Sequence, residues 1–283
     1  MQHVSSKSRL CVLGASAILV ALAAAAVPAG AFEPSPEMKA RMEQLEKTGA
    51  CPGCDFRDQT LRIMRIENAD LARAILRDAD MKNAAFPGAD LSRADLRRAG
   101  AEGADFAGAR FDRAEMRAVD LEKATLAKAS LQGVDLRDAD LRKVAADGAD
   151  FGGSDLRNAL MSRSDLTGSH FAGAKMSGCR MERSRIIGAD FSDAELDHAD
   201  LERVVARNAV FRGTGLAYSK LNHSDFAGAS FAGADLRNAS LRKTDLSGAD
   251  LSGARGLTQR QLDMACGSGA TKLPYGLSIQ SCQ

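Results

Sequence analysis

The sequence contains no tryptophan, and aromatic residues make up only 5% of its 283 residues. A globular core of this size ordinarily packs bulkier rings, so another architecture must bury the chain. An excess of charge of one sign is also missing, because 38 Lys and Arg face 37 Asp and Glu. This balance argues against a basic nucleic-acid binder and against a strongly acidic DNA mimic.

A long apolar run occurs once, at the N-terminus. Lys7 and Arg9 precede the run over residues 10–27, and an A-x-A sequence ends at Ala31. This order is typical of a secretory signal peptide that is cleaved after Ala31. The alternative is a retained membrane anchor, because the run approaches the roughly 20 residues needed to span a bilayer. We favour cleavage, since alanine is only weakly apolar and the A-x-A sequence follows the run directly.

The rest of the chain repeats with a period of five. Every fifth residue from Phe56 to Leu251, 40 positions in all, is large and apolar, except at Ala101, Ala146 and Ala206. We call these positions the centres of the repeat units. Alanine stands two residues before the centre in 24 of the 40 units, and aspartate often stands one residue before it. The consensus is A-D-L-x-x.

A period of five fits neither an α-helix, which needs about 3.6 residues, nor a strand, which needs two. A solenoid of square coils fits it, with one unit on each side of the coil. The centre and the residue two before it then point inward, and the other three point outward. Equivalent residues stack at the spacing of neighbouring strands, ~4.8 Å. The narrow interior explains the alanine and the missing tryptophan.

Units such as Ala69-Asp70-Leu71, Ala89-Asp90-Leu91 and Ala249-Asp250-Leu251 resemble the tandem repeats of the pentapeptide-repeat family. The resemblance covers about residues 51–256. It implies an all-β solenoid, a right-handed quadrilateral β-helix with four units per coil. Forty units then make about ten coils and a rod of roughly 48 Å.

Both ends of the repeats carry signals for short capping helices. Ser35 precedes a proline and Gly49 follows an amphipathic stretch, so we expect a helix over 36–48. Thr258 and Gln261 form a capping box, which predicts a short helix after the last repeat. The expected organisation is a signal peptide over 1–31, a linker and capping helix over 32–50, the β-helix over 51–256, and a C-terminal cap and tail over 257–283.

Five cysteines follow the signal segment. Cys51 and Cys54 form a C-P-G-C sequence, which is either a redox or half-metal motif or a structural clasp at the first coil. We favour the clasp, because no βαβ pattern surrounds the motif. Cys266 and Cys282 are expected to form a disulfide that fixes the C-terminal tail, which fits an oxidising compartment. Cys179 replaces an inward alanine and is expected to be a buried free thiol.

Residues twenty apart lie on one side of such a coil. On the side of Phe56, the residue after the centre is arginine in six successive coils: Arg57, Arg77, Arg97, Arg117, Arg137 and Arg157. This stripe is a candidate site for phosphate, polysaccharide or lipid headgroups. The alternative, which we favour, is a solvated charge lattice compensated by neighbouring Asp and Glu. The side of Leu61 is also charged, with Lys82, Glu122, Arg142, Lys143, Arg183, Arg203, Arg242 and Lys243.

On the other two sides, glycine recurs two residues after the centre, as at Gly88 and Gly133. These flat surfaces are either docking surfaces for a partner or carbohydrate, or the glycines are there only because the turn geometry requires them. We favour the turn, because a type II turn takes glycine at its second central position. His170, His198 and His223 fall on different sides and are not expected to converge as ligands.

Forty units without an insertion leave no loop that forms a cleft or lid. No catalytic, cofactor-binding or metal-ligating residues are therefore predicted. We expect a non-catalytic secreted or periplasmic scaffold that binds an unknown protein or an anionic envelope component through its surface, and no nucleic acid.

Two alternatives remain open. The family resemblance also implies a DNA mimic that protects topoisomerase, which the signal segment and the balance of 31 basic and 32 acidic residues in the repeats oppose. The other is an envelope-anchored structural protein, which would contact the membrane through an uncleaved N-terminal segment.

Overall fold

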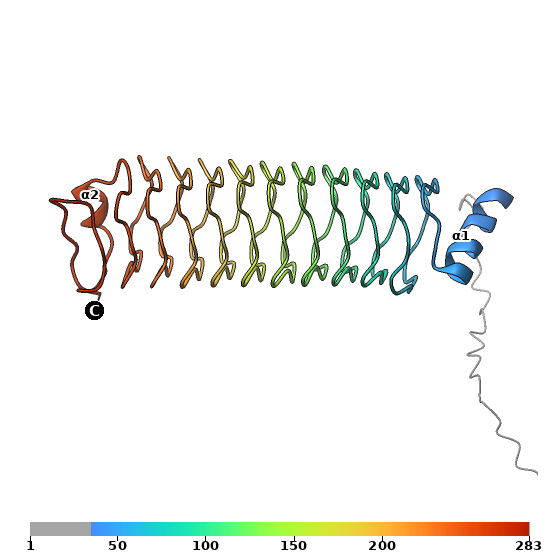
Figure 1. The fold of residues 1–283 in the computed structure, drawn as a ribbon, viewed down its shortest axis with the longest axis horizontal. Coiled ribbons are helices and arrows are strands. Elements are labelled where there is room, and N and C mark those ends of the chain that lie inside the picture. Colours follow the sequence, from blue (N-terminus) through green and yellow to red (C-terminus); the bar gives the residue numbers. More distant parts are fainter. Residues whose placement is uncertain (1–34, 283) are drawn as a thin grey trace, which may run out of the picture. The chain divides into compact units, whose positions relative to one another are not determined.

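The computed structural model describes residues 35–282. The predicted signal peptide and its cleavage site lie outside these residues. Two helices occur in the described part of the chain: α1 spans Pro36–Thr48 and α2 spans Gln259–Leu262. Between them the chain forms a stack of coils (Figure 1). Neither helix is long and apolar enough to cross a membrane.

Parallel bridges of a single residue join successive coils. The residue before each centre pairs with the residue twenty positions later, from Ala50 with Asp70 to Asp235 with Arg255. Such a bridge occurs at every fifth residue, so each coil of twenty residues has four short sides. The solenoid is therefore quadrilateral. Residues 50–255 hold no extended strand, because turn residues follow each bridge almost at once.

All units turn with the same backbone conformation. In most of them, the N–H three residues after the centre donates to the carbonyl of the centre, as from Ala94 to Leu91 at 3.0 Å. We name the two residues between them the first and second turn positions. The second turn position has a positive φ, 68° at Gly88 and 64° at Gly133. Positive φ also occurs at 25 residues other than glycine, although it costs an L-residue roughly 1–2 kcal/mol. Glycine therefore recurs here because of backbone geometry.

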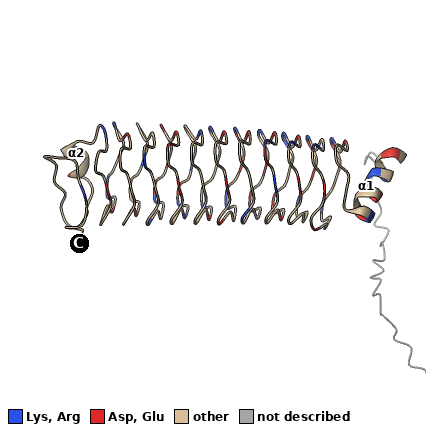
Figure 2. Ribbon diagram, in the orientation of Figure 1, with Lys and Arg blue, Asp and Glu red and all other residues tan. Residues whose placement is uncertain are grey.

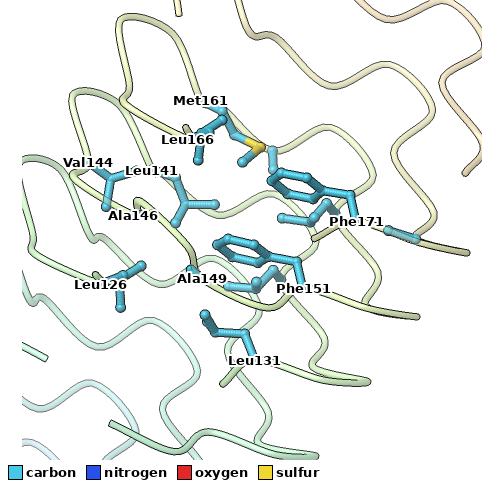
Figure 3. Packing of buried hydrophobic residues seen from close by; sticks show 14 of the residues in the cluster. Leu126, Leu131, Leu141, Val144, Ala146, Ala149, Phe151, Met161, Leu166 and Phe171 are labelled. Carbon is cyan, nitrogen blue, oxygen red and sulfur yellow. The ribbon is translucent and has the colours of Figure 1, made fainter. Parts of the chain in front are cut away.

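The centres and the residues two before them fill the interior, as Figure 3 shows around Ala146 and Phe151. Three centres are alanine, and each is followed five residues later by a phenylalanine. Because adjacent sides of a coil share one narrow interior, a small centre leaves room for a ring at the next one. The buried pairs are Ala101 with Phe106, Ala146 with Phe151, and Ala206 with Phe211.

Phenylalanine rings stack along one side of the interior. Phe151, Phe171, Phe191, Phe211 and Phe231 lie in successive coils, with ring centroids 4.8–5.0 Å apart and planes within 7° of parallel. The separation matches the ~4.8 Å spacing of neighbouring strands. The coil height thus equals the ring spacing, and the core of these coils is continuous.

Buried hydroxyl groups link some coils. Ser184 Oγ donates to the carbonyl of Met161 in the preceding coil at 2.7 Å and accepts from the N–H of Ser164 at 3.0 Å. Ser224 Oγ makes the equivalent bonds to Leu201 and Val204. Each serine hydroxyl therefore inserts into a turn of the preceding coil and satisfies the N–H and the carbonyl of that turn.

The helices lie at the two ends of the stack. Ser35 Oγ accepts from the N–H of Met38 at the start of α1, and the buried Leu45 joins the core. In α2, Thr258 and Gln261 form the expected capping box. Gln261 Nε2 also donates to the carbonyls of Leu236 and Ala239, both at 2.9 Å. The tail returns to the stack, because Lys272 bridges Asp250, and it closes on itself where Ser281 bridges Gly267.

Candidate functional site

Four outer faces follow from the coil, and each is named after its first centre: Phe56, Leu61, Ile66 and Leu71. Lys and Arg occur along the coils together with Asp and Glu (Figure 2). A basic side chain that already pairs with Asp or Glu is not free to bind an external anion.

On the Phe56 face, each of the six candidate arginines has a carboxylate partner. The shortest N–O distances lie between 2.5 and 3.2 Å, and the pairs are Arg57–Asp55, Arg77–Asp95, Arg97–Asp95, Arg117–Asp138, Arg137–Asp135 and Arg157–Asp155.

The contacts of Arg137 show how tightly such a pair is held. Its Nε and Nη2 donate to the two carboxylate oxygens of Asp135 at 2.8 and 2.6 Å, and its backbone N–H donates to the same carboxylate at 3.2 Å. These hydrogen bonds lower the pKa of Asp135 and raise the pKa of Arg137. An anion on this stripe would have to displace the aspartates, so the geometry favours the charge lattice.

The first half of the Leu61 face is neutralised in the same way. Glu102 accepts from Lys123 at 2.7 Å and from Lys82 at 2.6 Å, and these bonds lower the pKa of Glu102 to about 2. Glu122 accepts from Lys143 at 2.8 Å and from Arg142 at 3.1 Å. Little basic character remains uncompensated on these coils.

The second half of the Leu61 face differs. Its second turn positions hold a basic side chain or an imidazole in five successive coils, and all five are exposed. In the described part of the chain, none has a carboxylate within 4.0 Å or a side-chain hydrogen bond. We name these residues the basic row: Arg163, Arg183, Arg203, His223 and Lys243.

The carboxylates that precede Arg183 and Arg203 in the sequence accept hydrogen bonds from other residues. Glu182 accepts from Arg180 Nη2 at 2.7 Å and from Ser162 Oγ at 2.5 Å. Glu202 accepts from Asn222 Nδ2 at 2.8 Å. The basic row therefore keeps its donors free for an external acceptor.

A cavity of about 320 Å³ lies where the Leu61 face meets the C-terminal cap. Arg242 and Arg260 line it, together with Ser240, Gln261 and Met264. Neither arginine side chain has an ion-pair partner among the described residues. The sequence analysis named Arg183, Arg203, Arg242 and Lys243 only as charges of this side. A comparison of second turn positions at intervals of twenty would have separated the row.

The four candidate cysteines lie in two pairs. Cys51 and Cys54 form one disulfide, with Cα atoms 5.4 Å apart, and Cys266 and Cys282 form the other, with Cα atoms 4.8 Å apart. Cys179 is a free, buried cysteine, and burial raises the pKa of its thiol. Residues 35–282 therefore keep one free thiol.

One group of metal-ligand atoms occurs in the described residues, with Asp245, Cys266 and Cys282 within 4.8 Å of one another. Both sulfurs are bonded to each other, so neither is a thiolate that could hold an ion.

The three histidines of residues 35–282 do not converge. His170 and His223 lie on the Leu71 and Leu61 faces, whereas His198 stacks on Tyr218 with ring centroids 5.1 Å apart. The sequence analysis considered His198 only as a possible ligand. The separation of the two rings by twenty residues at the same turn position was the missed signal.

With this repeat geometry established, the chain belongs to the pentapeptide repeat family. The family model "Pentapeptide repeats (8 copies)" matches residues 65–100, 104–142, 147–183, 184–216 and 219–255. The match indicates no catalytic family. No curated protein matches the chain.

Solved structures of pentapeptide repeat proteins are similar to the chain. HetL, involved in heterocyst differentiation regulation in the cyanobacterium Nostoc sp. strain PCC 7120, is 27% identical; the alignment covers 81% of this chain and 96% of HetL, with a TM-score of 0.37. A trypsin-treated variant of QnrB1, a plasmid-mediated fluoroquinolone resistance protein, is 16% identical over 76% of this chain and 91% of QnrB1, with a TM-score of 0.31.

A protein from the Arabidopsis thaliana thylakoid lumen is 26% identical over 53% of this chain and 70% of its own, with a TM-score of 0.13. The family assignment rests on the family model and on the repeats themselves.

Proposed function

We propose that the protein is a non-catalytic scaffold that is exported to the periplasm or beyond the cell and binds through the outer surface of its coils. The coils are proposed to be right-handed and about ten in number, with α1 and α2 as caps. The unbroken succession of equivalent turns over residues 50–255 carries this proposal. A surface built this way offers long rows of side chains rather than the convergent polar groups that a catalyst needs.

Two features support export. The N-terminal sequence has the order of a signal peptide that ends at Ala31. The two disulfides fix the first coil and the C-terminal tail, and such bonds persist in oxidising compartments.

Fractionation of cells that express the full-length chain tests export, with the mass of the mature N-terminus as the measurement. The expected product is a periplasmic protein that begins at Phe32, and Cys179 is its one free thiol after denaturation without reductant. An Ala31→Arg variant, in which the cleavage site is blocked, serves as the control and should stay full-length in the membrane fraction.

The other outcomes point to other functions. A wild-type chain that stays full-length in the membrane would indicate an envelope-anchored protein. A full-length cytosolic chain would overturn export and make topoisomerase protection the hypothesis to test. Pull-down from the envelope fraction with the mature protein then identifies the partner.

A further inference from the structure

The basic row is straight and evenly spaced. Its members occupy the same turn position in five successive coils, and the bridges hold those coils in parallel register. At ~4.8 Å per coil, the row from Arg163 to Lys243 is about 19 Å long. A ligand that contacts the whole row must be extended and must carry its anionic groups at similar intervals.

Charge gathers in this half of the Leu61 face. Its outward positions from 160 to 243 carry seven Lys and Arg against three Asp and Glu, whereas those from 60 to 143 carry five of each. The excess of basic residues begins in the same coil as the basic row, at Arg163. The excess of basic residues and the absence of ion pairs along the basic row therefore occur in the same five coils.

Of the three carboxylates in the adjoining corner, those near Arg163 and His223 are paired with arginines, whereas Asp245, near Lys243, has no ion-pair partner among the described residues. On the Ile66 face, Asp165 lies 3.6 Å from Arg185 Nε, and Asp225 lies 2.6 Å from Arg207 Nε. Because both carboxylates are partnered, an approaching polyanion meets basic groups first.

We propose that the basic row, continued by the cavity that Arg242 and Arg260 line, binds an extended acidic polysaccharide with one carboxylate on each sugar. This inference names the ligand class of the proposed binding scaffold and rests on that function. Successive sugars of an extended uronate chain turn their carboxylates to different sides, and the carboxylates on the side that faces the row meet its basic groups. Guanidinium groups bind carboxylates through paired hydrogen bonds.

The chemistry of the face separates this ligand from other polyanions. Single-stranded nucleic acids stack their bases on aromatic side chains, and the outward positions of the Leu61 face from 160 to 243 carry no Phe, Tyr or Trp and a single imidazole, His223. A flat anionic membrane would also press against Glu182 and Glu202, which lie beside the row. A single polymer chain contacts the row without covering its acidic neighbours.

Affinity electrophoresis of the mature protein in gels that contain polygalacturonate tests the proposal. In the test variant, Arg163→Asn, Arg183→Asn and Arg203→Asn are combined. Asparagine suits these positions, because Asn158 and Asn208 hold the same turn position with φ of 61° and 57°. We expect polygalacturonate affinity to fall about tenfold, since three charged contacts are lost.

The matched control removes three arginines that are already paired on the Phe56 face: Arg97→Gln, Arg117→Gln and Arg137→Gln. It loses the same net charge and should bind like the wild type. Equal loss in both variants, or no loss in the test variant, would overturn the proposal. Thermal unfolding of both variants shows that each remains folded.

Three further samples assign the ligand class: neutral dextran, vesicles with phosphatidylglycerol, and a single-stranded oligonucleotide. Stronger binding to vesicles or oligonucleotide than to polygalacturonate would overturn the polysaccharide assignment. If an exported wild-type protein does not bind polygalacturonate, this inference fails while the proposed export and scaffold function stand.

Discussion

The serine at position 184 provides the sharpest test of how the coils are joined. Alanine is the commonest residue two before the centre, so the repeat pattern predicts that Ser184→Ala is harmless. The structure predicts the opposite, because the hydroxyl of Ser184 lies between the N–H of Ser164 and the carbonyl of Met161. In an ordinary turn, such as Ala159 to Leu156, these groups bond directly at 3.0 Å.

The loss follows from these two hydrogen bonds. Removal of the hydroxyl leaves a buried donor and a buried acceptor in the coil below, and each such group costs about 1–3 kcal/mol when unpaired. The turn regains part of this by closing on itself. We therefore expect Ser184→Ala to lower the free energy of unfolding by about 1–3 kcal/mol, measured by urea denaturation.

Ser154→Ala is the matched control. Ser154 Oγ donates only to the carbonyl of Phe151 in its own turn, where the N–H of Ser154 already donates at 3.1 Å. Its removal leaves no backbone group unpaired, so the expected change is within about 0.5 kcal/mol. Equal unfolding free energies for the two variants would refute the assigned role of the inserted hydroxyl. Loss of protection from hydrogen exchange at the N–H of Ser164 would support it.

Three other measurements check the core and the charges. Leu136→Asp should unfold the coils, because Leu136 is fully buried and an unpaired carboxylate there has no partner; an unchanged melting temperature would contradict the inward assignment. Cys179 should resist iodoacetamide in the native protein and react after denaturation, since burial raises the pKa of its thiol; rapid native modification would show that the site opens. Glu102 has its pKa lowered from 4.5 to about 2, so its charge favours the folded state above pH 4.5, and this contribution is lost as the pH falls from about 4.5 to about 2. Lys123→Gln should raise the pKa of Glu102 in an NMR titration, and an unchanged value would exclude this contact as the cause.

Much of the fold follows from sequence spacing. The centres from Phe56 to Leu251 identify the buried side chains, because a five-residue unit has few ways to place one large side chain inward. Gly88 identifies the turn geometry. The helix over Pro36–Thr48 has the start and end that Ser35 and Gly49 predict. Each of these features depends on residues within one unit or one helical turn, where local chemistry decides the conformation.

The candidate site could not be predicted as completely. Arg97 and Arg163 have the same chemistry, and both recur every twenty residues. Only the structure shows that Arg97 donates to Asp95 at 2.7 Å, whereas Glu182 of the Leu61 face already accepts from Arg180 and Ser162. The pattern located rows of basic residues but did not show which of their side chains are unpaired.

The sequence by itself determined the period, the inward positions, the turn residues and the cysteines available for pairing. Tertiary structure decided which charges cancel. Arg137 pairs within its own unit, Arg77 pairs with Asp95 of the next coil, and Arg117 reaches Asp138. A long guanidinium side chain reaches carboxylates above, below and beside it at similar distances. The choice among them depends on how the coils stack and which partners are already occupied, and spacing along the chain does not contain that information.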